Sequence, residues 1–348
     1  MSLIAILTDT HYGARKNSKE FHNYFNEFYQ NVFFPTLEEY DIKTVLHLGD
    51  VFDNRRVIDY QSLEWSKTNI FDKLVNYDVH MLTGNHDCYY KNTNKLNSLQ
   101  LLLDSYSNIS VYDNVSVVDI HGELITLIPW INSENEKDVM DCLNTTTSRV
   151  VMGHLEINGF EAHPGHIFEG GLDKDVFSKF KRVFSGHFHH KSKMDNIHYL
   201  GNTYEITWSD YGEERGFHLY DTQTGRLKFI QNPYRMFKKF YYDDIIHEYI
   251  NPDLSEYKNS YVKVIVENKT NLYTFDKLIE TFYNTGVHDL KIIENIHVIS
   301  DEDDSETISH EDTLSTLQRY IDDIDDNYDK SSLKSLIKSI YIEASDSQ

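Results

Sequence analysis

Cysteine is nearly absent from this chain of 348 residues. Only Cys88 and Cys142 occur, far apart and outside any metal-binding spacing, so neither a disulfide framework nor a zinc ribbon is indicated. Long apolar runs are also lacking, because no stretch approaches the ~20 apolar residues that span a membrane. The first residues show no basic leader with a cleavage site. These absences favour a globular chain in a reducing cytoplasm, with no membrane partner.

Basic side chains are in short supply as well. The chain holds 33 Lys and Arg against 56 Asp and Glu, a formal charge of −23. Lys and Arg supply most non-specific affinity for DNA by neutralising phosphates, so this balance argues against DNA binding by the chain alone. Residues 301–348 hold 14 acidic and 4 basic side chains, which leaves −13 for the first 300 residues. Bound cations and a basic partner subunit would offset that charge, and we interpret the charge as a sign of a partner.

What the chain has in quantity is material for a packed core. Hydrophobic residues make up 40% and aromatic residues 14%, with 25 Tyr and 19 Phe, which argues against wholesale disorder. The length exceeds what one hydrophobic core usually organises. The sequence therefore predicts a main domain with smaller C-terminal parts.

Short apolar runs typical of buried strands alternate with amphipathic segments. The runs cover residues 3–7, 44–49, 79–84, 123–130, 149–154 and 181–187. Between them, residues 20–40, 59–77 and 96–103 carry apolar side chains at helical spacing. The order is largely βαβ, which predicts an α/β fold.

The remaining pattern predicts further units after a main domain at residues 1–235. Residues 236–300 are predicted to form a small α+β capping domain, in which residues of about 261–298 have the pattern of strand, helix and strand. Residues 301–310 form an acidic linker, and residues 311–348 contain two amphipathic helices, at about 311–325 and 331–344. We expect these C-terminal helices to dock on a partner, although packing within the chain is the simpler explanation.

Metal-binding side chains follow the ends of the predicted strands, where α/β proteins present functional residues on short loops. The set comprises Asp9, His11, Asp50, Asn85, His86, His154, His187 and His189. Imidazoles suit Mn, Fe, Zn or Ni better than Mg or Ca, which prefer oxygen ligands. The mixture of histidine with aspartate and asparagine therefore favours a transition metal.

Several of these positions have roles that the residue type suggests. Asp9 and His11 leave one strand, and alternation along an extended backbone would place both on the same side. Asp50 can bridge two ions because a carboxylate has two oxygens. Asn85 offers a carbonyl oxygen, which leaves the adjacent His86 free to act on a substrate.

Each motif also has a plain structural explanation. Asp-x-His after a strand is commonly a polar turn, Gly-Asp a strand exit, Gly-Asn a turn and His-x-His an exposed strand face. Independent accidents would, however, have to fall at consecutive strand ends in a fixed order. The joint occurrence therefore indicates a metal centre.

The ordered set D-x-H, GD-x-x-D, GNHD, GH and GH-x-H resembles the calcineurin-like metallophosphoesterases over about residues 3–220. GDVFD without a following Arg-Gly, and GNHD in place of GNHE, are similar to SbcD-type DNA repair nucleases rather than to protein Ser/Thr phosphatases. LIPW at 127–130, GHLEINGF at 153–160, SGHFH at 185–189 and RGF at 215–217 resemble segments of the recombination endonuclease subunits of T4-like bacteriophages. The implied fold is a metallophosphoesterase β-sandwich flanked by helices (αββα).

The resemblance also implies how the site residues divide. One ion would be held by Asp9, His11, Asp50 and His189, and the other by Asp50, Asn85, His154 and His187. His86 would be the catalytic histidine. The implied cofactors are two divalent ions, with Mn²⁺ the expected metal. Asp53 stands where cellular relatives often have histidine, and it keeps no assigned role, nor do Glu156, Arg55 and Arg56.

The activity implied is that of an Mn-dependent DNA endo/exonuclease subunit of an SbcCD-like recombination and repair complex. The implied partners are DNA, an SbcC-type coiled-coil ATPase gripped by the C-terminal helices, and a second copy of the chain, as a homodimer within a heterotetramer. A phage-encoded chain would act in the host bacterial cytoplasm. Two alternatives stay open: a small-molecule phosphodiesterase or nucleotidase with the same centre, and a non-catalytic scaffold subunit, which predicts damage at ligand positions that are in fact intact.

Overall fold

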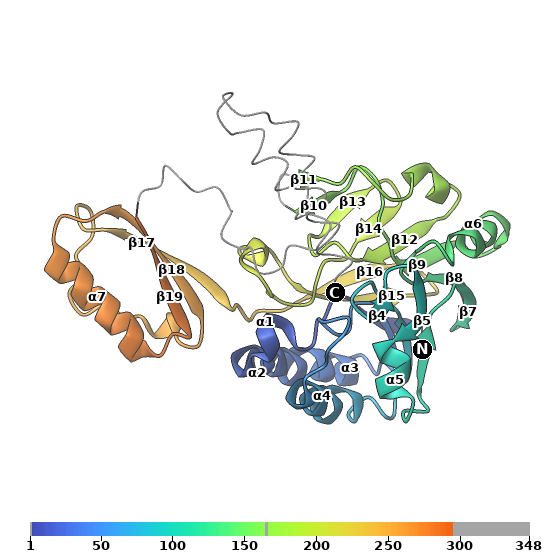
Figure 1. Cartoon of the computed structure of the whole chain (residues 1–348), viewed down its shortest axis with the longest axis horizontal. Coiled ribbons are helices and arrows are strands. Elements are labelled where there is room, and N and C mark those ends of the chain that lie inside the picture. Colours follow the sequence, from blue (N-terminus) through green and yellow to red (C-terminus); the bar gives the residue numbers. More distant parts are fainter. Residues whose placement is uncertain (1, 164–165, 295–348) are drawn as a thin grey trace, which may run out of the picture. The chain divides into compact units, whose positions relative to one another are not determined.

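The computed structural model describes residues 2–163 and 166–294 (Figure 1). The predicted acidic linker, the two C-terminal helices and the last residues of the predicted capping domain lie outside the described residues. Across the part of the chain that is described, no helix combines the length and apolar character needed to cross a membrane.

Two six-stranded sheets form the centre of the fold. The first has the order β16-β15-β1-β2-β3-β6 and consists of β1 (Leu3–Leu7), β2 (Thr44–His47), β3 (Asp78–Leu82), β6 (Ile109–Tyr112), β15 (Gly216–Asp221) and β16 (Leu227–Gln231). Strands β1, β2, β3 and β6 are parallel, and β15 and β16 are antiparallel to their neighbours.

The second sheet has the order β13-β14-β12-β9-β8-β7. It consists of β7 (Ser116–Ile120), β8 (Glu123–Ile128), β9 (Val150–His154), β12 (Arg182–Gly186), β13 (Ser192–Met194) and β14 (Ile197–Tyr199). Its central strands β8, β9, β12 and β14 are parallel.

Alternating side chains of each central strand bury against two different layers. In β1, Ile4 and Ile6 pack between the sheets against Leu127 and Met152 of the second sheet, whereas Ala5 and Leu7 face the helices. Both faces of the strand are thus apolar, as in sheets covered on both sides. This explains why the central strands read as continuous apolar runs.

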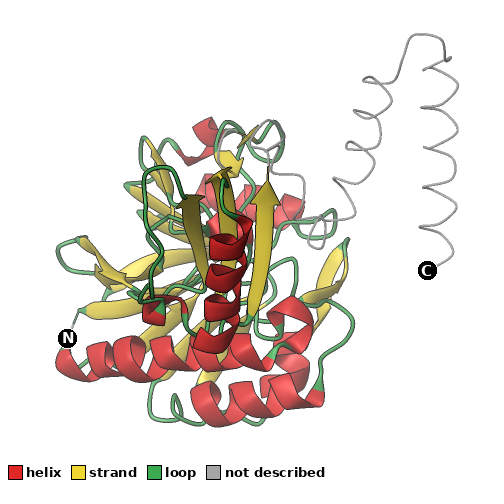
Figure 2. Cartoon of the chain, turned by 90° about the vertical axis from the view of Figure 1, so that its left-hand side faces the viewer, coloured by secondary structure: helices red, strands yellow, loops and turns green. Residues whose placement is uncertain are grey.

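Helices cover the outer face of each sheet, which gives the predicted αββα layering. The first sheet is covered by α1 (Ala14–Asn17), α2 (Lys19–Phe28), α3 (Phe34–Glu39), α4 (Tyr60–Ser66) and α5 (Ser98–Leu103). In Figure 1, α1 to α4 lie together on one side of the strands, and Figure 2 shows this helical layer in red. The second sheet is covered by α6 (Glu136–Thr145) and a 3₁₀ turn at Lys174–Phe177.

The helices are shorter than the amphipathic segments predicted. A π-helical turn at Tyr29–Phe33 separates α2 from α3, and another at Lys67–Phe71 follows α4. The helix expected from residue 96 begins at Ser98, because the side chain of Asn97 caps it by accepting from the amide of Gln100 at 2.8 Å. Leu96 belongs instead to the hairpin of β4 (Cys88–Tyr90) and β5 (Thr93–Asn97).

Residues 237–294 form a further three-stranded parallel sheet with one helix. Its elements are β17 (Phe237–Asp243), β18 (Tyr261–Asn268), α7 (Leu272–Thr285) and β19 (Asp289–Glu294), with a 3₁₀ turn at Ser255–Tyr257. Helix α7 buries Phe275, Leu278 and Phe282 against Val262 and Val264 of β18. Strand β17 was not among the elements that the sequence pattern predicted. The other short elements are β10 (Glu161–His163), β11 (His166–Ile167) and a 3₁₀ turn at Trp208–Asp210.

Candidate metal centre

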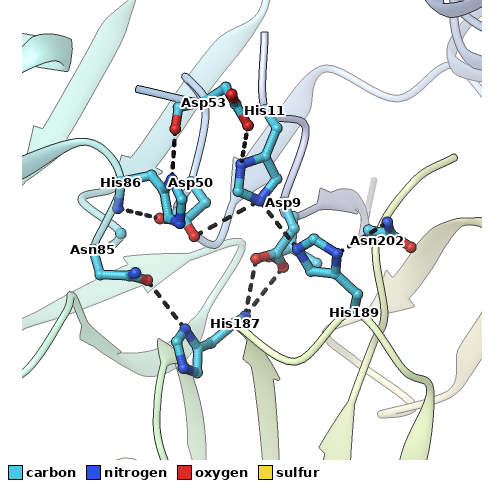
Figure 3. Close-up of polar contacts among 12 residues, drawn as sticks. Asp9, His11, Asp50, Asp53, Asn85, His86, His187, His189 and Asn202 are labelled. Carbon is cyan, nitrogen blue, oxygen red and sulfur yellow. Dashed lines mark hydrogen bonds and ion pairs between the residues drawn. The ribbon is translucent and has the colours of Figure 1, made fainter. Parts of the chain in front are cut away.

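The loops that follow β1, β2, β3 and β12 meet at one edge of the sandwich together with the last residue of β9, His154, and they carry the site residues predicted from the sequence. Figure 3 shows most of these side chains. A first cluster contains Asp9, His11 and His189, whose possible ligand atoms lie within 4.8 Å of one another. The Nε2 atoms of His11 and His189 are only 3.1 Å apart. Two imidazole nitrogens at this distance face a common point.

A second cluster contains Asp50, His154 and His187, again with ligand atoms within 4.8 Å of one another. The side-chain amide of Asn85 reaches into it, with Oδ1 at 3.0 Å from His154 Nε2 and 3.1 Å from His187 Nδ1. His187 and His189 therefore point into different clusters although one residue separates them.

Asp50 lies between the clusters. Its Oδ2 atom is 3.8 Å from His11 Nε2 in the first cluster and 3.4 Å from His154 Nε2 in the second. Its Oδ1 atom accepts a hydrogen bond of 2.8 Å from the amide of His86. Oδ2 therefore faces both clusters, whereas Oδ1 accepts a hydrogen bond from the main chain. Asp50 does not direct one oxygen to each cluster.

The second cluster gathers hydrogen-bond acceptors with too few donors. His154 donates through Nδ1 to the carbonyl of Leu48 at 2.9 Å, which leaves a lone pair on Nε2 when the ring is neutral. With neutral histidines and no ion, the amide nitrogen of Asn85 has two hydrogens for the three acceptor atoms of Asp50, His154 and His187, while its oxygen accepts from Arg55. With an ion, the carbonyl oxygen of Asn85 would be available as a fourth donor atom beside Asp50, His154 and His187. These donors suit a divalent transition-metal ion.

Four of the candidate ligands have left-handed backbone conformations. The φ angles are 51° at Asp9, 43° at His11, 55° at Asp50 and 84° at His187. Such conformations cost free energy in residues other than glycine, and they cluster at functional sites. The expected alternation along an extended backbone is therefore the wrong reason for the proximity of Asp9 and His11, which is set by a turn instead.

Two glycines of the motifs are required by close approach. A Cβ atom at Gly84 would overlap the carboxylate and main chain of Asp50, and one at Gly186 would overlap the hydroxyl of Thr8. That hydroxyl donates to Asp9 at 2.5 Å. Any larger residue at either position would displace a candidate ligand.

Carboxylates outside the ligand sets orient two of the histidines. Glu156 Oε1 lies 3.0 Å from His187 Nε2, so that His187 presents Nδ1 to the second cluster. Asp53 Oδ1 lies 3.4 Å from His11 Nδ1, on the side of the ring away from His189. Carboxylates in such positions fix the tautomer and raise the basicity of metal-binding imidazoles. The sequence had left Asp53 and Glu156 without a role.

His86 belongs to neither four-residue set, although its ring lies close to both. Its Nδ1 donates to the carbonyl of Asp53 at 2.5 Å, which leaves Nε2 available to a substrate. Its ring contacts that of His11 edge to face at 4.8 Å between centroids, and His11, Asp53 and His86 also have ligand atoms within 4.8 Å of one another. Burial lowers the pKa of His86.

Nearby charges raise the pKa values of two candidate ligands. Burial alone would lower the pKa of His11, but hydrogen bonding to Asp53 and the charge of Asp50 raise it to about 9. Burial is likewise outweighed at His154, where Asp50 raises the pKa to about 9. By contrast, burial lowers the pKa of His47 to about 3. In the metal-free chain, protons thus occupy positions that metal ions would take.

Two buried charged residues that sequence reasoning missed hold the loops in place. Asp87 accepts hydrogen bonds from the amides of Val51 at 3.1 Å, Phe52 at 3.1 Å and Gly84 at 2.9 Å, and so joins the loop after β2 to the loop after β3. Burial and the charge of Asp50 raise its pKa to about 7. The GNHD motif contains Asp87, and this was the only signal for it.

Arg215 has the corresponding position on the side of the first cluster. Its guanidinium donates to the carbonyl of His189 and to the side chain of Asn202, and it pairs with Asp210 at 3.2 Å and Glu213 at 2.8 Å. The Arg-Gly-Phe segment was noticed in the sequence only as part of a resemblance.

Comparison with known proteins agrees with this geometry. The family model described as calcineurin-like phosphoesterase matches residues 2–191, more than half of the chain. The chain belongs to the calcineurin-like phosphoesterase family. Membership confirms the predicted resemblance, the predicted fold class and the enzyme class: the chain is a metal-dependent phosphoesterase, a hydrolase acting on ester bonds, and members of this family use divalent metals.

One curated relative of this phosphoesterase covers most of its length. Exonuclease subunit 1 of Enterobacteria phage T4 is 33% identical over 308 residues, which cover 87% of this chain and 88% of the relative. Two solved structures match at lower similarity. An archaeal phosphodiesterase has 13% identity and a TM-score of 0.35, covering 66% of this chain and 99% of the other. The nuclease MPE of Pseudomonas putida has 16% identity and a TM-score of 0.29, covering 64% and 85%.

Proposed function

We propose that this phosphoesterase is the nuclease subunit of an SbcCD-like recombination and repair complex, and that it cuts DNA by hydrolysis at a centre of two Mn²⁺ ions. The observation that carries the proposal is the pair of donor clusters that share Asp50, in a chain related over most of its length to a phage exonuclease subunit. The name of that relative, an exonuclease subunit, supports both a nuclease activity and membership of a complex.

The two donor sets support a division of the ligands. Asp9, His11, Asp50 and His189 would hold one ion, because three of them form the first cluster and Asp50 Oδ2 faces it. The second ion would lie among Asp50, Asn85, His154 and His187. Such ions, when bound, polarise the phosphoryl oxygens and lower the pKa of an attacking water.

His86 is proposed as the catalytic residue. Its Nδ1 is held by the Asp53 carbonyl, so that the ring is fixed and Nε2 can carry a proton toward the substrate. Cleavage of a phosphodiester leaves negative charge on the departing 3′ oxygen. A hydrogen bond or proton from Nε2 would stabilise that charge.

The proposed partners follow from charge and from the relative. An acidic chain with a net charge of −23 has little basic surface of its own for DNA. A basic ATPase subunit of the SbcC type would supply the rest of the DNA surface, with the C-terminal residues 311–348 as the docking element. A second copy of the chain would complete a heterotetramer.

The test compares substrates and one variant. The wild-type chain is incubated with Mn²⁺ and single-stranded or duplex DNA, and in parallel with bis-p-nitrophenyl phosphate or cyclic nucleotides. We expect cleavage of DNA, and in His86→Ala we expect a loss of about 10²- to 10⁴-fold in kcat with metal content unchanged. Turnover of the small substrates alone would favour a small-molecule phosphodiesterase, and full activity in His86→Ala would remove the proposed role of His86.

A further inference from the structure

A pair of exposed tyrosines lies directly beyond the proposed catalytic histidine. Tyr89 and Tyr90 belong to β4, three and four residues after His86, and they are 39% and 52% exposed. Their rings contact each other edge to face at 4.7 Å between centroids. Three residues span at most about 10 Å, so the main chain of Tyr89 lies within that distance of His86.

A basic loop approaches the same tyrosines from the other side. The guanidinium of Arg56 lies 5.8 Å from the ring centroid of Tyr89. Arg56 follows Asp53 by three residues, as Tyr89 follows His86, and Asp53 is hydrogen-bonded to His86. The loop after β2 and the loop after β3 therefore run side by side from the metal centre to the tyrosines.

The basic loop is ordered by its own side chains. The Oδ1 atom of Asn54 accepts from the amides of Arg56 at 2.9 Å and Val57 at 3.0 Å. Arg55 Nη2 lies 3.3 Å from the outer atom of the Asn85 amide. In an acidic chain, two successive arginines thus extend from a candidate ligand to an aromatic ring, and they complement the charge of a phosphate backbone.

The hairpin that carries the tyrosines is anchored from beneath. Asn94 of β5 is buried, accepts from the thiol of Cys88 at 3.1 Å and donates to the carbonyl of Trp130 at 2.7 Å. The amide of Asn132 donates to the same Asn94 at 2.9 Å. Buried hydrogen bonds on the inner face hold β4 rigid while its two aromatic rings face solvent.

A groove continues from the second tyrosine. It has a volume of about 430 Å³ and is lined by Tyr90, Asn92, Thr93, Leu96 and Ser133, together with the ion pair of Lys95 and Glu134. This volume falls in the ~300–1,000 Å³ range of clefts that bind small organic groups. The combination of the apolar side chains of Tyr90 and Leu96 with polar ones suits a planar nucleobase.

We infer that Tyr89, Tyr90 and Arg56 form a base-stacking platform that binds unpaired nucleotides next to the scissile phosphodiester. The inference rests on the proposed nuclease function and names its substrate class, which is DNA with unpaired bases at the cut. Rings exposed on a rigid support bind bases without sequence preference, because every base has a π face. A paired base would present its edge rather than its face to the rings, so a duplex must fray to use the platform.

The test removes either the tyrosines or the bases. A single-stranded DNA decamer is compared with a decamer of the same backbone in which every nucleotide is abasic. We expect Tyr89→Ala/Tyr90→Ala to lower kcat/KM for the intact decamer by about 10-fold or more, and to leave cleavage of the abasic decamer unchanged. The Tyr89→Phe/Tyr90→Phe variant should keep the wild-type rate. Tyr273→Ala is the matched control, since the ring of Tyr273 is exposed, has Lys277 Nζ 5.5 Å from its centroid, and belongs to α7, which carries no residue of the metal centre.

Three results would overturn the inference. The alanine variant could cleave the intact decamer at the wild-type rate, or lose activity equally on both decamers. A loss accompanied by a change of oligomeric state in light scattering would assign the tyrosines to a subunit interface instead. Failure of the proposed function looks different: the wild-type chain would hydrolyse bis-p-nitrophenyl phosphate and neither decamer, and the inference would fall with it.

Discussion

The two clusters of the proposed metal centre lie on either side of Asp50 but differ in how their histidines are held. In the second cluster, His154 is fully buried and is fixed by a hydrogen bond to the main chain. Each cluster also has one histidine oriented by a side-chain carboxylate, His11 in the first and His187 in the second. The side chain of His189 in the first cluster is 27% exposed, against 17% for His187 in the second. A ligand held by the main chain and shielded from water loses less freedom on binding. The second cluster is therefore the better preorganised of the two, and we expect it to bind its ion more tightly.

Replacement of Asp50, the proposed shared ligand, should have the largest effect on metal binding, because both clusters would lose a ligand. We expect Asp50→Asn to weaken binding of both ions by more than about 100-fold, beyond the loss typical of an outer partner, and to abolish hydrolysis. Asparagine tolerates the left-handed φ of 55° at this position. The measurement is Mn²⁺ titration by calorimetry, with His86→Ala as the control that retains both ions. An ion bound by Asp50→Asn at the wild-type affinity would contradict the shared role.

Replacement of the carboxylates that orient His11 and His187 should change the metal affinity of one cluster at a time. We expect Asp53→Asn to weaken only the ion of the first cluster, and Glu156→Gln only that of the second, each by about 10- to 100-fold. Each amide keeps the shape of the carboxylate but loses the charge that supports the neighbouring imidazole. Mn²⁺ titration of both variants resolves the two sites. If both variants weaken the same ion, the division of ligands is wrong.

The sequence alone identified the candidate ligands but not the residues that orient them. A histidine or aspartate after a strand carries its own signal, whereas Glu156 and Asp53 resemble ordinary surface carboxylates until folding brings them to His187 and His11. Arg215 is a stronger case, since it reaches the main chain of His189 across 26 residues of sequence. Long-range pairing of this kind has no local pattern.

For the fold as well, elements with a clear local sequence pattern were predicted, and elements that depend on contacts between distant residues were not. Central strands were predicted because burial on both faces makes them continuously apolar. Strand β17, with the sequence FKKFYYD, has polar and half-buried positions that obscured its pattern. The π-helical turn at Tyr29–Phe33 was also missed, because tertiary packing of Tyr29 and Phe33 rather than local propensity sets it.

Metal binding should release protons from both clusters, and the resulting dependence of metal affinity on pH should be a smaller effect than the substitutions above. The pKa values of His11 and His154 are raised to about 9, one histidine in each cluster. Each imidazole must lose its proton to bind metal, so below pH 9 we expect affinity to fall by about tenfold per pH unit for each proton displaced. Calorimetry between pH 6.5 and 8.5, in buffers of different ionisation enthalpy, counts the protons. Affinity that is independent of pH would show that the histidines are already neutral without metal.

The smallest expected effect concerns the support of the second cluster. Asp87→Asn weakens hydrogen bonds to the amides of Val51, Phe52 and Gly84, and we expect a loss of about 1–3 kcal/mol in the free energy of unfolding. The folded-state pKa of Asp87 is about 7, raised from 3.8. The stability that Asp87 contributes is therefore fully present below pH 3.8 and is lost as pH rises through 7, whereas asparagine does not titrate. The difference between wild type and variant should shrink from pH 5.5 to pH 8 in urea denaturation with chelator present. A difference that grows with pH would mean that the ionised carboxylate, rather than the protonated one, is the form that holds the two loops together.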